Sequence, residues 1–268
     1  RARPDSADGS TIRINGDVVE VGKSVSSKTA RRVAVVISLI VGVIFGSQFN
    51  ANWSEILLMF NAQSFGTTDP QFGLDNGFYV FVLPGLKLVL AAVAMLLGVG
   101  LVFSVVTHVL MGGIRITMPV NGRGLFSITK RCRRQLGIWL MLNMFAWAVR
   151  QMIGVFDQLT VQGSRITGAS YTAVHANIPV TFIMAALTAI LGVVLGIWLM
   201  RSHTLEGQAS IGVRASAALK AWRVPVTSIA VVVVVGLVLT VAWPVLLQRF
   251  RVNPNAQEME STYIQRNI

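Results

Sequence analysis

Few side chains in this sequence could do chemistry inside its long apolar segments. All eleven acidic residues lie outside these segments, whose interiors contain only three basic groups: Lys87, His108 and Arg150. A coupled ion transporter usually needs a carboxylate within the membrane, so the distribution counts against that class. For His108, near one end of its segment, we favour a hydrogen-bonded packing role over catalysis.

Arg150 is the most informative of the three. Asn143, Trp147 and Arg150 follow each other at i, i+4 and i+7 and so share one face of a helix. Together with Lys87 at the same end of the bundle, Asn143 and Arg150 could form a polar pocket for an anionic lipid or substrate. These three are our candidate site residues.

Purely structural roles for the two basic residues are the alternatives to that pocket. Lys87 could be an anchoring lysine whose chain extends to the membrane interface. Arg150 could form a structural ion pair with Asp157, or with a loop acid such as Asp69 or Asp75. For both basic residues we favour these structural roles.

We find no constellation that predicts catalysis, a cofactor or a metal. The sequence contains no H-E-x-x-H, P-loop, G-x-S-x-G or G-x-G-x-x-G motif, and its three histidines lack metal-ligand spacing. The single cysteine, Cys132, stands in a basic cluster. We consider a cysteine without a special role far more favoured there than a redox sensor. We therefore predict a protein that is not an enzyme, with no catalytic, cofactor-binding or metal-binding residue.

The elements that position these residues are predicted to be membrane-spanning helices. The sequence is 53% hydrophobic and only 13% charged, and apolar runs of 18 or more residues can cross a bilayer. The predicted spans are residues 32–49, 84–110, 135–155, 178–200 and 226–247. The fold class is therefore an all-α membrane protein, a five-helix transmembrane bundle. Two G-x-x-x-G pairs would let helices pack closely: Gly42 with Gly46, and Gly192 with Gly196.

Three regions are predicted along the chain. Residues 1–30 form a cytoplasmic N-terminal segment with a small β-hairpin around Asn15-Gly16, residues 31–250 form the bundle, and residues 251–268 begin an extracytoplasmic domain. Residues 51–65 suit a short amphipathic helix in the interface, and we expect Asp69 to cap the second span. Residues 211–223 suit a separate helix lying on the membrane surface.

Basic residues predict the orientation. With Arg32, the first residue of the first span, counted with the segment before it, the segments before the first span, between the second and third, and between the fourth and fifth hold 17 lysines and arginines, against 4 in the alternate segments. Cytoplasmic loops carry this excess, so the N-terminus is expected in the cytoplasm of a bacterial plasma-membrane protein and the C-terminus outside. The charge is expected to meet anionic lipids at the cytoplasmic loops; nucleic-acid binding is not expected.

Four segments resemble actinobacterial members of uncharacterised protein family 0182, which are large multi-pass bacterial membrane proteins. They are FGTTDPQFGLDNGFYVFVLP (65–84), HVLMGGIRI (108–116), ITGASYTAVHANIP (166–179) and VNPNAQEMESTYIQRNI (252–268). The similarity runs from about residue 60 to the end. It implies seven spans followed by a large outer domain, with this chain as the third to seventh spans and the outer domain starting near Arg251. The family has no assigned activity, so the resemblance implies no catalytic residue.

Two functions follow as hypotheses. The first is a membrane anchor or scaffold that binds partner helices or envelope machinery, favoured by the absence of membrane carboxylates and by the two G-x-x-x-G faces. The alternative is a transporter or lipid-handling protein with a basic pocket in the outer leaflet.

Overall fold

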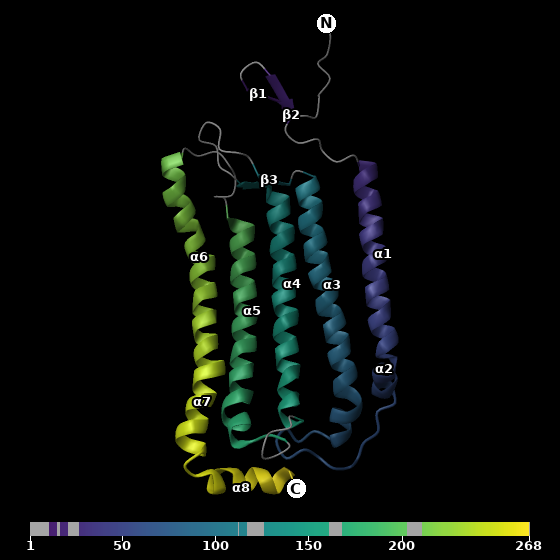
Figure 1. The fold of residues 1–268 in the computed structure, drawn as a ribbon, viewed down its shortest axis with the longest axis vertical. Coiled ribbons are helices and arrows are strands. Elements are labelled where there is room, and N and C mark those ends of the chain that lie inside the picture. The colour runs from purple at the N-terminus through teal and green to yellow at the C-terminus, as the bar shows by residue number, and fades with distance from the viewer. Residues whose placement is uncertain are drawn as a thin grey trace.

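The long helices of the chain stand side by side in a single row (Figure 1). The computed structural model describes residues 11–14, 17–20, 27–111, 113–116, 126–160, 168–202 and 211–267. The helices of the row are α1 (Ser27–Ala51), α3 (Leu83–Leu110), α4 (Lys130–Gly154), α5 (Ile178–Arg201) and α6 (Ile211–Leu237). The most extensive contact joins α4 to α5, and α1 has the slightest contact with its neighbour, α3.

Four helices in the described part of the chain are long and apolar enough to cross a membrane. They cover Phe78–Leu110, Lys130–Leu159, Ala173–Arg201 and Trp222–Val252. A predominantly helical membrane protein is therefore supported. The predicted first span, residues 32–49, falls within α1, which is not among these four, so the count of five spans stays a prediction.

Three of the four wider, π-helical turns in the described residues explain how the long helices accommodate proline. They are η1 (Phe78–Val82), η3 (Ala173–Asn177) and η5 (Val238–Ala242). Each ends two residues before a proline, namely Pro84, Pro179 or Pro244. Proline lacks an N–H and its ring collides with the carbonyl four residues earlier, and a wider turn relieves both problems. The second and fourth spans therefore begin before their prolines.

The remaining elements are short; some of them continue the long helices, and the others lie at the ends of the row. They are α2 (Trp53–Phe60), η2 (Val155–Leu159), α7 (Trp243–Leu247), η6 (Gln248–Val252), α8 (Ala256–Asn267) and four strands, β1 (Thr11–Ile14), β2 (Asp17–Glu20), β3 (Ile114–Ile116) and β4 (Phe126–Ile128). β1 pairs antiparallel with β2, and β3 with β4. The turn predicted at Asn15-Gly16 lies outside the described residues. α2 falls within the segment predicted as a short interfacial helix.

Two local predictions are wrong. Asp69 does not cap a helix, because η1 begins nine residues later; it closes a turn instead. The helix predicted to lie separately on the membrane surface is the first part of α6, which continues through Pro225 to Leu237. Pro225 is buried, and a packed helix tolerates a proline that would end an isolated one.

The buried core lies at the end of the row where α4 begins. Ile128, Cys132 and Leu136 form its centre, and Cys132 is fully buried there. The basic cluster that contains Cys132 therefore does not present it to solvent, as a redox-sensing thiol requires.

Candidate functional site

Lys87 forms an ion pair with Asp157, between the first turns of α3 and η2, just beyond α4. Both side chains are about two-fifths exposed (39% and 40%). The predicted pairing of Arg150 with Asp157 is therefore wrong, because α4 has already ended at Gly154 and the turn that follows directs Asp157 to α3. Lys87 is part of an inter-helix contact.

Asn143 also joins α3 to α4. Its side-chain amide donates hydrogen bonds to the backbone carbonyls of Leu97 on α3 (3.1 Å) and Trp139 on α4 (2.8 Å). Arg150, in contrast, is exposed and makes no ion pair with any acid that the structure describes. Of the three candidate pocket residues, two are thus engaged by protein atoms and one faces outward.

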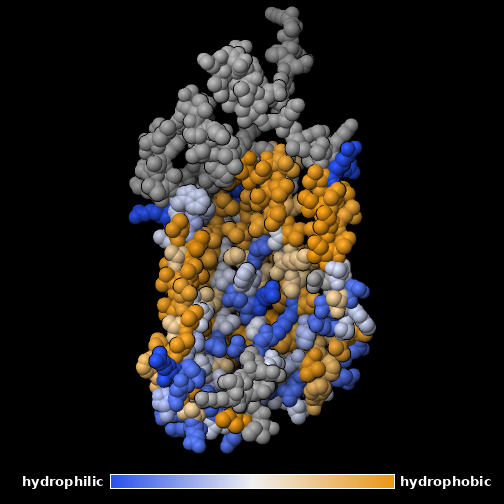
Figure 2. Space-filling model, viewed as in Figure 1, coloured by the Kyte–Doolittle hydropathy of each residue, from blue (hydrophilic) through white to orange (hydrophobic). Residues whose placement is uncertain are grey.

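The exposed surface of the row is mostly apolar. Figure 2 shows hydrophobic side chains covering much of one face, interrupted by a hydrophilic patch over α4 and its neighbours in the lower half. Exposed apolar side chains run along α6 and η5, including Val234 (59%) on α6 and Val241 (56%) on η5. A surface of this kind is stable only against lipid or other apolar helices.

The two G-x-x-x-G pairs have different surroundings. A Cβ added at Gly192 would lie 2.4 Å from Met144 Cβ, and one at Gly196 would lie 2.4 Å from Met141 Cγ. This pair therefore sits inside the contact between α4 and α5. A Cβ at Gly42 or Gly46 would meet nothing within 4 Å, so the pair on α1 faces open space.

Two carboxylates organise the loop between α2 and α3. Asp69 is 8% exposed and accepts hydrogen bonds from the Phe72 N–H (2.5 Å) and the Tyr79 hydroxyl (3.3 Å). Asp75 accepts bonds from the Ser64 hydroxyl (2.5 Å) and from backbone N–H groups of Phe65 (3.0 Å), Gly66 (3.1 Å) and Gly77 (2.7 Å). Because both acids hold the loop together, neither is free to pair with Arg150.

The loop should therefore weaken in acid. The hydrogen bonds to Asp75, led by that from Ser64, lower its pKa from the ordinary 3.8 to about 2. A carboxyl whose pKa falls on folding stabilises the fold above its unfolded pKa, and that contribution is lost as pH falls through the folded pKa, here from about 4 to about 2. Carboxyl NMR in detergent micelles should find the low pKa, and Ser64→Ala should raise it. An unchanged pKa in the variant would contradict this assignment.

At the same end of the row, the tail folds back across the helix ends (Figure 1). On α8, Glu260 accepts a hydrogen bond from the Tyr171 N–H (3.2 Å), and the Tyr263 hydroxyl lies 3.4 Å from His175 Nδ1. Tyr171 and His175 stack with ring centroids 4.1 Å apart, and the Arg251 guanidinium lies over Tyr171. Sequence analysis missed this cluster because its two parts are 76 or more residues apart (171 and 175 against 251–263).

A second aromatic cluster lies beside the Asp69 loop. Phe72, Phe78 and Tyr79 each meet Phe156 edge to face, with centroids 5.0, 5.3 and 6.2 Å apart. The cluster ties the loop to η2, the turn that carries Asp157.

In the described part of the chain, no three His, Cys, Asp or Glu side chains gather as a metal site.

Comparison with known proteins gives one consistent relationship. The profile of an uncharacterised protein family, UPF0182, matches residues 5–268. A UPF0182 protein of Bifidobacterium adolescentis is 79% identical over 267 residues, covering 100% of this chain and 25% of the relative. One of Corynebacterium glutamicum is 33% identical over 238 residues (89% and 22%), and one of Kocuria rhizophila is 35% identical over 239 residues (88% and 22%).

These matches confirm the resemblance predicted from the sequence and extend it. The profile begins at residue 5, so the similarity includes the N-terminal region and does not start near residue 60. The chain spans about a quarter of the length of the curated relatives it matches. No solved structure matches it.

Proposed function

We propose that this chain, which belongs to the uncharacterised protein family UPF0182, is a non-enzymatic membrane scaffold within a larger protein and binds partner helices. The observation that carries this proposal is the single row of helices, whose exposed apolar side chains have no partner among the described residues. A row has two broad faces and a free edge at α6, so it can join further helices without rearranging.

The proposal includes five spans and an orientation. α1 has 25 residues, and a helix of that length covers about 38 Å at 1.5 Å per residue, enough to cross a bilayer. The loops rich in lysine and arginine favour a cytoplasmic N-terminus. α8 would then lie outside the membrane, at the start of an extracytoplasmic region.

The alternative, a transporter or lipid-handling protein with a basic outer pocket, has less support. Lys87 is neutralised by Asp157, and Asn143 is bonded to backbone carbonyls. Of the three candidate pocket residues, only Arg150 is left to attract an anion, and a single arginine does not make a specific anion site.

Photo-crosslinking in native membranes tests the scaffold. A photoreactive residue at Val234 or Val241, on the exposed stripe along α6 and η5, should form adducts with a protein segment, either elsewhere in the full-length chain or in a separate membrane protein. The same residue at Thr67, in an exposed loop, controls for capture from the aqueous phase. Lipid adducts alone at both valines would refute the proposal.

A further inference from the structure

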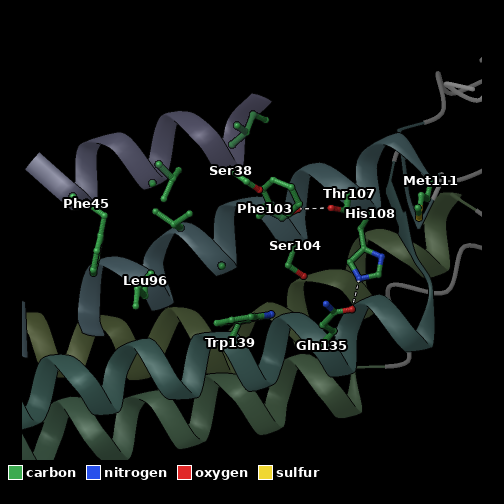
Figure 3. A pocket seen from close by; sticks show the side chains of 16 residues that line it. Ser38, Phe45, Leu96, Phe103, Ser104, Thr107, His108, Met111, Gln135 and Trp139 are labelled. Atoms are coloured by element: carbon green, nitrogen blue, oxygen red, sulfur yellow. Dashed lines mark hydrogen bonds between the residues drawn. The ribbon is translucent and has the colours of Figure 1, made fainter. Parts of the chain in front are cut away.

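A groove separates α1 from α3 and α4 at the end of the row where α1 and α4 begin. We call this the basic end of the row, because Arg31 and Arg131 lie there. Its volume is about 790 Å³, within the usual range for small-molecule sites. The walls are mainly apolar side chains such as Phe45, Leu96 and Phe103, and Gly42 and Gly46 form an open strip along α1. Figure 3 shows His108, Gln135 and Ser104 gathered towards one end of this apolar wall.

One buried polar atom in the groove has no partner. Ser104 is 5% exposed, and its Oγ makes no hydrogen bond to the protein. A serine in a helix ordinarily bonds to a backbone carbonyl one turn earlier, and the neighbouring Thr107 does so with Phe103 (2.6 Å). Leaving a buried hydroxyl unbonded costs free energy. Ser104 is therefore placed to donate to an acceptor on a molecule in the groove.

The polar end of the groove continues into positive charge from both walls. Gln135, which lines the groove, contacts His108 (3.0 Å), and Arg131 lies one turn earlier on the same face of α4, about 6 Å along the axis. On α1, Arg31 precedes the lining residue Ser38 by seven positions and so shares its face. Both arginines are exposed, and no described acid pairs with either.

We propose that this groove binds one anionic glycerophospholipid. An acyl chain would lie along Gly42, Gly46 and Leu96, an ester oxygen would accept the Ser104 hydroxyl, and the phosphate would lie between Arg31 and Arg131. Along the groove, the apolar wall is followed by the buried Ser104 hydroxyl and then by the two arginines. The acyl chain, the ester and the phosphate of such a lipid follow each other in the same order. Basic sites between helices at the cytoplasmic leaflet are known headgroup sites. The inference needs the helices to be in a membrane and does not depend on their acting as a scaffold.

Native mass spectrometry of the full-length protein, delipidated and then given dioleoyl phosphatidylglycerol or phosphatidylcholine, tests the site. One phosphatidylglycerol should be retained in preference to phosphatidylcholine. Neutralising both arginines, with Arg31→Gln and Arg131→Gln together, should weaken its binding by about 30-fold. Arg201→Gln, an exposed arginine at the same end outside the groove, should leave binding unchanged.

Variants that fill the groove provide a second, independent test of the lipid site. The double variant Gly42→Leu with Gly46→Leu should abolish retention without unfolding, since nothing lies within 4 Å of either added Cβ. Gly154→Leu is the matched control, because it too has open space and lies outside the groove. Ser104→Ala should reduce retention of the lipid; without a ligand, it would only remove an unbonded hydroxyl.

Three results would overturn the inference: equal retention of the two lipids, retention by the groove-filling variant, or a crosslink from Val41 in the groove to another protein segment in place of lipid. The last would leave the scaffold intact and assign the groove to a helix. The α6 crosslinking experiment reports on the opposite edge of the row, so the two proposals can fail separately.

Discussion

Replacing Gly196 by leucine is expected to prevent α5 from packing against α4 and to leave little folded protein in detergent. A Cβ at this position would lie 2.4 Å from Met141 Cγ and 2.9 Å from the Gly137 carbonyl oxygen. The methionine can move aside, but the carbonyl belongs to the α4 backbone and cannot without displacing the helix. In lipid, where close packing drives helix association more than burial does, that displacement separates the largest contact of the row.

The effect should grow with the size of the side chain. Gly196→Ala should cost about 1–3 kcal/mol, the usual range for overpacking, and Gly196→Leu more. Fluorescence-detected size exclusion after heating should show a lower midpoint for alanine and loss of the folded peak for leucine. Gly154→Ala, on α4 with open space around its Cβ, should change neither. A Gly196→Leu protein as stable as the parent would show that α4 and α5 do not meet here.

The contrast between the two glycine pairs shows what the sequence could predict. A G-x-x-x-G spacing predicts a helix face that another helix can approach closely. The spacing at 42–46 and at 192–196 is identical. It does not say which helix approaches. Gly196 meets α4 because Gly137 on α4 also lacks a side chain, which brings the backbones together. Gly137 stands in no such pair, so its role is visible only in three dimensions.

Charge pairing shows the same limit. The apolar runs that form the spans were recognisable because hydrocarbon requires long helices with few charges. From the sequence, Arg150 is the only partner predicted for Asp157, seven residues away; Lys87, seventy residues away, is interpreted as an anchoring lysine. The choice is made by the end of α4 at Gly154 and by η2, which Phe156 holds against Phe72 and Phe78. The periodicity of apolar residues in the sequence does not predict those contacts.

Removing either partner of the Lys87–Asp157 pair should destabilise the protein more than removing Arg150. Each single change, Lys87→Met or Asp157→Asn, takes away one charge and leaves the other beside lipid, where an unpaired charge costs up to about 3 kcal/mol at the bilayer centre. The pair lies near the ends of its helices and is partly exposed, so we expect about 1–2 kcal/mol for each single variant.

The double variant, Lys87→Met with Asp157→Asn, decides what the pair contributes. If the two charges stabilise the fold by neutralising each other, the double variant should lose less stability than the two single losses together, because it leaves no isolated charge. Thermal midpoints of all variants in the same detergent provide the measurement. Arg150→Met is the matched control: it also replaces a cation in the same half of the row, but one that makes no ion pair with a described acid, and its midpoint should stay near that of the parent. Strictly additive losses would mean that Lys87 and Asp157 do not stabilise each other. A larger loss for Arg150→Met would favour Arg150 as the partner of Asp157 and would return Lys87 to its predicted role as an anchoring lysine.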